Sequence, residues 1–357
     1  MTVSGGFPAP GSQDRDPARQ APYAGPQPTG PPVQSPGSMQ QVPTLTAHKP
    51  GIVPLRPLQL GDILDGAVKA VRFNPKSMVG LSVLVLATFL VPSAALGVGA
   101  THLMARAVGS TSPDAQGFVG FVTSGLQLLS TTLATAVLSG LLIHVVGQSV
   151  LGRKPDIGET WRATRGRVLS LLGLICLSGL FGVLATAVLL GPAALLLLNN
   201  DIAAGVIVGI LGIIGLLVVS VFVSTKISLA APAIVLEGHG VRVGIRRSFA
   251  LTRGPAFWRV LGITLLAGII AGFVGYLLGV PLLGVGFVIT VMSGPDSQAG
   301  TIIVTLVSHL SALLTGAITT PFVAAVTGLL YIDRRMRLEA LDVVLLRAAQ
   351  STPPPRT

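Results

Sequence analysis

The stretch LQLGDILDGAVKAVRFNPK, residues 58–76, decides how the rest of the chain is organised. Its apolar residues recur at the spacing of one helical face, so it predicts a short amphipathic helix. The stripe consists of Leu60, Ile63, Leu64, Ala67, Val68 and Val71. Asn74 and Pro75 end this helix, because the residue before a proline avoids the helical conformation. An apolar run of membrane-spanning length follows, so the helix is predicted to lie at a membrane surface.

Composition supports a membrane protein. Half of the 357 residues are hydrophobic, only 10% are charged, and the mean hydropathy is +0.77. A soluble domain carries about 25% charged residues. The net charge of +11 would suit a nucleic-acid-binding protein, but the charges sit in short loops between apolar runs. That distribution is typical of membrane topology, so we expect no nucleic-acid partner.

The predicted fold class is all-α: a polytopic integral membrane protein with six transmembrane helices and three cytoplasmic amphipathic helices. Residues 1–57 are rich in Pro, Gly and Gln and predict a disordered cytoplasmic tail. Residues 58–330 form the six-span domain, and residues 331–357 a basic cytoplasmic C-terminal helix and tail. The expected spans lie within residues 77–101, 118–150, 168–198, 202–236, 257–292 and 301–330.

The distribution of charge predicts the topology. Nearly all Lys and Arg residues beyond the N-terminal tail lie before the first span, in residues 152–167, in residues 237–254 or after the last span. The alternate connections hold Arg106 as their only basic residue. The positive-inside rule therefore predicts a multi-pass protein of a bacterial plasma membrane with both termini in the cytoplasm.

The unit of an amphipathic segment followed by two spans occurs three times, with Gly61, Gly158 and Gly244 near the start of each segment. We expect these helices to lie in the headgroup plane with their apolar sides toward the bilayer. Their basic residues are candidate contacts for anionic lipid or for a protein partner at the cytoplasmic face, and residue identity does not separate the two. These candidates are Lys69, Arg72, Arg162, Arg165, Arg242, Arg246 and Arg253.

Three stretches carry a family resemblance: residues 58–76, APAIVLEGHGVRVGIRRSFALTRGPAFWRVLGITLL (231–266) and LLYIDRRMRLEALD (329–342). They resemble the membrane domain named for glycerophosphoryl diester phosphodiesterases, in its actinobacterial stand-alone form. The resemblance covers about residues 55–346. The soluble barrel of the fused enzymes needs roughly 200 residues or more outside the membrane, which exceeds the predicted terminal segments 1–57 and 331–357. The resemblance therefore implies a membrane module of unknown activity.

No catalytic set, metal-ligand spacing or phosphate-binding loop stands out, so we expect no enzyme activity, no metal and no cofactor. His309, in the hydroxyl-rich sixth span, and Lys226, near the inner end of the fourth, are the candidate intramembrane polar site. A hydrogen bond to a neighbour's hydroxyl is the structural alternative for His309, and snorkelling is the alternative for Lys226. Pro232 and Pro321 are expected to be paired kinks.

The sequence thus favours a non-enzymatic membrane module that engages anionic lipid or a protein partner through its basic cytoplasmic face. The alternative is a transporter or permease for a small or lipidic substrate, which His309, the expected kinks and the hydroxyl-rich sixth span would serve. The sequence leaves the oligomeric state open.

Overall fold

The computed structural model describes residues 51–54, 56–108, 113–294 and 297–339, and every regular element among them is helical. The helices are α1 (Leu60–Phe73), α2 (Pro75–Val108), α3 (Pro113–Val150), α4 (Ile157–Thr164), α5 (Val168–Leu198), α6 (Ile202–Ile227), α7 (Ala230–Glu237), α8 (Val241–Leu251), α9 (Ala256–Ser293) and α10 (Gln298–Glu339). A 3-10 turn, Arg165–Arg167, joins α4 to α5. Six stretches are long and apolar enough to cross a membrane, which confirms the predicted fold class.

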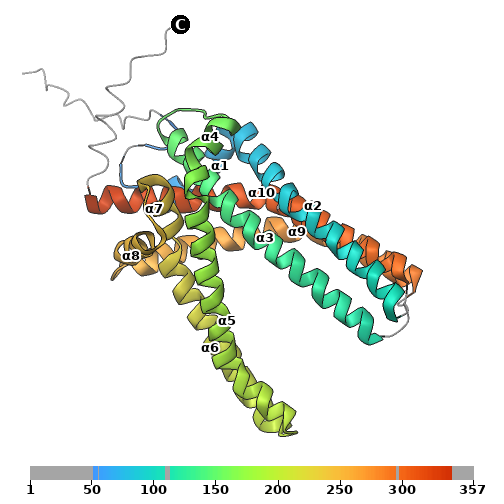
Figure 1. The fold of residues 1–357 in the computed structure, drawn as a ribbon. Coiled ribbons are helices and arrows are strands. Elements are labelled where there is room, and N and C mark those ends of the chain that lie inside the picture. The colour runs from blue at the N-terminus through green and yellow to red at the C-terminus, as the bar shows by residue number, and fades with distance from the viewer. Residues whose placement is uncertain (1–50, 55, 109–112, 295–296, 340–357) are drawn as a thin grey trace, which may run out of the picture. The chain divides into compact units, whose positions relative to one another are not determined.

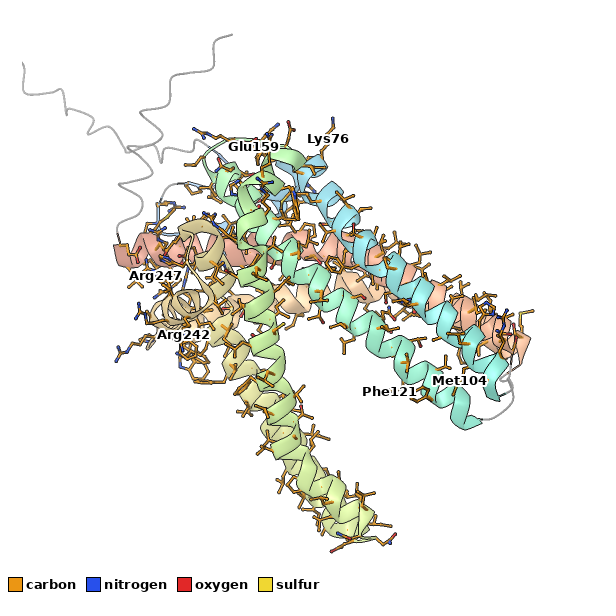
Figure 2. All side chains as sticks on the ribbon, in the orientation of Figure 1. Lys76, Met104, Phe121, Glu159, Arg242 and Arg247 are labelled. Carbon is orange, nitrogen blue, oxygen red and sulfur yellow. The ribbon has the colours of Figure 1, made fainter. Side chains whose placement is uncertain are left out.

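The long helices pack as three hairpins, α2–α3, α5–α6 and α9–α10, and α10 also packs along α2 and α3 (Figure 1). Figure 2 shows Lys76 and Glu159 near one end of the α2–α3 pair, and Met104 and Phe121 toward the other. We call these the basic end and the opposite end. The amphipathic helices α1, α4 and α8 connect to the spans at the basic end.

The amphipathic helix α1 has the expected bounds but turns its apolar stripe toward protein. Ile63, Ala67 and Ala70 are fully buried and belong to the main core with residues of α2, α3 and α10. Only Leu60 and Val68 of the predicted stripe stay exposed. The expectation that the whole stripe faces the bilayer is therefore wrong, because the chain supplies its own apolar surface for this helix to cover.

The fourth predicted span, residues 202–236, corresponds to the apolar stretch Ile202–Glu237 but consists of two helices. The α6 helix stops at Ile227, and the separate helix α7 begins at Ala230, after Ser228 and Leu229. Pro232 therefore lies in the first turn of α7 rather than in a kink, at a place where its missing N–H costs no intrahelical hydrogen bond. Pro321 does lie inside α10, as expected.

The α10 helix runs unbroken past residue 330, the predicted limit of the six-span domain, and ends at Glu339. Tyr331 and Asp333, in the predicted basic tail, are fully buried. Near the other terminus, Ile52 and Val53 belong to the predicted tail and are buried in the core. The rest of that tail, residues 1–50 and 55, and residues 340–357 lie outside the described residues.

Candidate functional site

The candidate site lies at the basic end, where α8 presents three of the predicted arginines. Ser248 fixes this helix, because its hydroxyl donates to the Lys226 carbonyl and accepts the Leu229 N–H at 3.2 Å. A Cβ on Gly244 would lie 2.6 Å from Ile234 Cγ1, so only glycine lets α8 approach α7 this closely. The docked face leaves Arg242, Arg246 and the following Arg253 exposed.

One mostly buried carboxylate, that of Glu237 at the end of α7, pairs with cations from α8 and α10. Arg247 donates to it from Nε and NH2 at 3.2 and 3.3 Å, and Arg335 Nε lies 3.2 Å from it. The Tyr331 hydroxyl also donates to it, and Arg247 forms a second ion pair with Glu339. Burial alone would lower the pKa of Arg247, but the bond to Glu237 and the charges of both glutamates raise it above its usual value. Arg247 is therefore a cation already committed to partners inside the protein.

A second carboxylate, Asp333 of α10, is fully buried and holds the chain just before α1. It accepts the Leu58 N–H at 2.8 Å and pairs with Arg259 at 3.2 Å and Arg337 at 2.9 Å. The same two guanidinium groups each donate to the Leu58 carbonyl at 2.7 Å. The chain before α1 and the helices α9 and α10 thus meet at one carboxylate.

Two groups of arginines at the basic end differ in their partners. Arg247, Arg259, Arg335 and Arg337 pair with Glu237, Asp333 or Glu339 and form the paired arginines. The second group, the exposed arginines, consists of Arg72, Arg165, Arg242, Arg246 and Arg253, and none of them forms an ion pair with a residue in the described part of the chain.

The other two predicted contacts, Lys69 and Arg162, are exposed but already bind groups of their own helices. Lys69 forms an ion pair with Asp65 one turn earlier in α1, and Arg162 Nε donates to the Gly158 carbonyl at 3.3 Å. Figure 2 labels one arginine of each kind on α8, the paired Arg247 and the exposed Arg242. Seven residues predicted from three sequence segments thus share the basic end, and five of them form the exposed arginines.

Lys226 stabilises the end of α8. Its ammonium group donates to the Thr252 carbonyl at 2.8 Å and lies 5.1 Å from the centre of the Phe257 ring. Arg334 Nε donates to the Leu251 carbonyl at 3.1 Å, so two cations complement the carbonyl end of α8. Lys226 therefore belongs to the basic end, and the structure does not bring it together with His309.

His309 is buried in α10 toward the opposite end, with both ring nitrogens bonded. Nδ1–H donates to the Thr305 carbonyl at 2.7 Å, and Nε2 lies 3.1 Å from the Ser93 hydroxyl oxygen of α2. This geometry matches the structural alternative, a hydrogen bond to a neighbour's hydroxyl.

His309 lines a cavity of about 380 Å³ between α3, α9 and α10. Its lining includes the polar residues Thr123, Ser124, Gln127, Thr290, Ser297, Thr301, Thr305 and Ser308. Most of these hydroxyls donate to carbonyls of their own helices, as Thr301 and Thr305 do at 3.3 and 2.9 Å. The cavity therefore offers chiefly acceptor oxygens.

The sequence did not point to Glu237 or Asp333 as the organising carboxylates. A signal was present, since each is an acidic residue next to a cluster of arginines. Within the described part of the chain, no three His, Cys, Asp or Glu side chains come together as metal ligands would.

These features define a multi-pass α-helical membrane protein with six apolar helices. Residues 58–328 match the family described as a domain of unknown function, DUF7847, and the chain belongs to this family. No curated protein and no solved structure matches the chain. The resemblance to the membrane domain named for glycerophosphoryl diester phosphodiesterases stays a prediction.

Proposed function

We propose that this protein is a non-enzymatic membrane module whose basic end binds the headgroups of anionic phospholipids. The observation that carries the proposal is the group of exposed arginines, which have no ion-pair partner in the described residues, although Arg247 on the same helix as Arg242 and Arg246 is paired. Exposed guanidinium groups at a membrane surface attract anionic lipid and donate to phosphate oxygens in pairs.

The orientation belongs to the same proposal. The positive-inside rule puts the basic end at the cytoplasmic leaflet of the plasma membrane, where anionic headgroups create a negative surface potential. Trp161 on α4, which is 46% exposed, and Trp258 on α9, which is 72% exposed, support an interface at this end. Tryptophan side chains favour the headgroup level, because one part of the indole ring is apolar and the other donates a hydrogen bond.

The test is retention of lipid by the purified full-length protein, measured by native mass spectrometry after addition of phosphatidylglycerol and phosphatidylcholine in equal amounts. The variant replaces the three arginines of the α8 region, Arg242→Gln, Arg246→Gln and Arg253→Gln. Each basic residue near an anionic surface contributes about 1 kcal/mol, and about 1.4 kcal/mol changes an affinity tenfold. Retention of phosphatidylglycerol is therefore expected to fall at least about tenfold.

The matched control is Arg106→Gln, because Arg106 is exposed in the last turn of α2, at the opposite end. This control is expected to retain phosphatidylglycerol as the wild type does. A triple variant that keeps its phosphatidylglycerol but loses a crosslink to a cytoplasmic protein would contradict the lipid proposal and favour a protein partner.

Transport of a small solute is a second candidate function, and the cavity at His309 favours it. Toward the basic end, however, α2 and α3 fill the centre of the bundle with Leu86, Leu90, Leu138 and Leu142, all at most 1% exposed. Transport would therefore require these helices to separate. Loss of function in His309→Ala, with lipid retention unchanged, would support transport over the lipid proposal.

A further inference from the structure

A shallow apolar groove of about 280 Å³ lies at the junction of α1, α9 and α10. Its lining includes Val68, Val71 and Arg72 of α1, Ile270 and Val274 of α9, and Phe322 of α10. The one hydroxyl in the lining, that of Thr319, donates to the Thr315 carbonyl at 2.9 Å. Arg72 is therefore the one charged group beside an otherwise apolar surface.

Arg72 is exposed and belongs to the exposed arginines, whereas its neighbour Lys69 pairs with Asp65. Val68, one turn before Arg72, is 40% exposed although it belongs to the apolar stripe of α1. The protein thus leaves both an apolar surface and a cation uncovered at the same place. This combination is complementary to an amphipathic anion, with an apolar chain for the groove and a negative charge for Arg72.

The groove lies at the depth that a lipid would need. Gly316 of α10 lies against Leu86 of α2, and Leu86 is roughly 17 Å along the helix from Pro75, where α2 starts. Phe322 follows Gly316 toward the basic end and therefore lies nearer the start of α2. Arg72 comes just before that start, so the charged end of the groove is level with the beginning of the apolar span.

We propose that this groove binds one acyl chain of an anionic phospholipid, with the phosphate of that lipid paired to Arg72. The inference rests on the proposed function, which it deepens by adding a defined site for one lipid molecule. A guanidinium group suits this role, because its planar donors can pair with two phosphate oxygens at once. The groove supplies the apolar contact that a headgroup site alone lacks.

The test uses photoactivatable phosphatidylglycerol that carries a diazirine in its acyl chain, added to the full-length protein in lipid nanodiscs. We expect crosslinks at Ile270–Val274 of α9 and around Phe322 of α10, several-fold above those on the exposed helix α6. Arg72→Gln is expected to lower the labelling of the groove at least threefold, and Arg72→Lys to restore part of it. Val274→Trp fills the groove and should abolish its labelling, whereas Val218→Trp on the lipid-facing surface of α6 is the matched control.

Equal labelling of the groove by the phosphatidylcholine analogue, unchanged labelling in Arg72→Gln, or a crosslink to a second copy of the chain would each overturn the inference. The triple variant at Arg242, Arg246 and Arg253 should keep its groove labelling. If that variant loses phosphatidylglycerol while the wild-type groove is never labelled, the groove proposal fails and the proposed function stands. If labelling depends on Arg72 while the triple variant retains all its lipid, the α8 surface fails and the groove stands.

Discussion

The paired and the exposed arginines lie at the same end of the protein but differ in their structural role. The paired arginines connect helices, since Arg247 joins α8 to α7 and α10, and Arg259 joins α9 to α10 and to the residue before α1. The exposed arginines connect nothing within the described residues. Two carboxylates, the fully buried one of Asp333 and the mostly buried one of Glu237, thus decide which cations hold the fold and which remain available to an external anion.

The largest expected effect on stability comes from Asp333→Asn. The change leaves the guanidinium groups of Arg259 and Arg337 without a carboxylate and weakens the acceptor for the Leu58 N–H. Removing one member of a fully buried ion pair costs about 3–5 kcal/mol, and we expect the lower end of this range here, because the side chains of Arg259 and Arg337 are 32% and 34% exposed. We expect a markedly lower midpoint when the purified protein is heated and its remaining folded fraction is measured by size-exclusion chromatography. A midpoint equal to that of the wild type would show that the Asp333 carboxylate does not stabilise the chain before α1.

A smaller effect is expected from Glu237→Gln. Glu237 is partly accessible, with 10% of its side chain exposed, and its amide replacement can still accept from the Tyr331 hydroxyl. Loss of the negative charge is expected to lower the free energy of unfolding by about 1–3 kcal/mol. The same heating assay should give a midpoint between those of Asp333→Asn and the wild type. A midpoint below that of Asp333→Asn would reverse the ranking of the two carboxylates.

The smallest effect on stability is expected from the triple variant Arg242→Gln, Arg246→Gln and Arg253→Gln. Exposed substitutions away from a packed contact usually change the free energy of unfolding by less than about 0.5 kcal/mol. The heating midpoint should therefore match that of the wild type, even though retention of phosphatidylglycerol falls. A large drop in midpoint would mean that these arginines hold the fold and belong with the paired group.

The spans were predictable from the sequence, because a helix that crosses the bilayer core must be apolar along its length. The predicted limits of the third span, 168 and 198, are those of α5, and the predicted turn after it holds Asn200 in the left-handed conformation at φ 61°. Hydropathy says little about packing, however. The most apolar window of α3 is 56% buried in protein, whereas that of the α6 stretch is 6% buried, because an apolar helix is equally well solvated by lipid.

The two helix limits that the sequence did not predict, at the ends of α6 and α10, have a common physical reason. The break between α6 and α7 depends on Ser248, which binds the Lys226 carbonyl and the Leu229 N–H from a distant helix. Past residue 330, α10 is held by Tyr331 and Asp333, which bind Glu237 of α7 and Arg259 of α9. Long-range contacts of this kind leave no periodic trace in a single sequence.

The candidate site was predictable only in part, because charge placement can be read from a single sequence whereas long-range contacts cannot. Charge placement alone grouped Arg242, Arg246 and Arg253 at one membrane face, and the structure leaves all three exposed. Hydropathy also singled out Lys226 and His309, but their partners, Thr252 and Ser93, are distant in sequence or on another helix. Which arginines are paired could be learned only from the positions of Glu237 and Asp333.

The most direct test of the central claim is lipid selectivity at the surface of the full-length protein in bilayers. Spin-labelled phosphatidylglycerol and phosphatidylcholine report, by electron paramagnetic resonance, the fraction of each lipid immobilised by the protein. We predict several-fold selectivity for phosphatidylglycerol that decreases with added salt and is largely lost in the triple arginine variant, since salt screens exposed charges. Equal immobilisation of the two lipids by the wild-type protein at low salt would contradict the account.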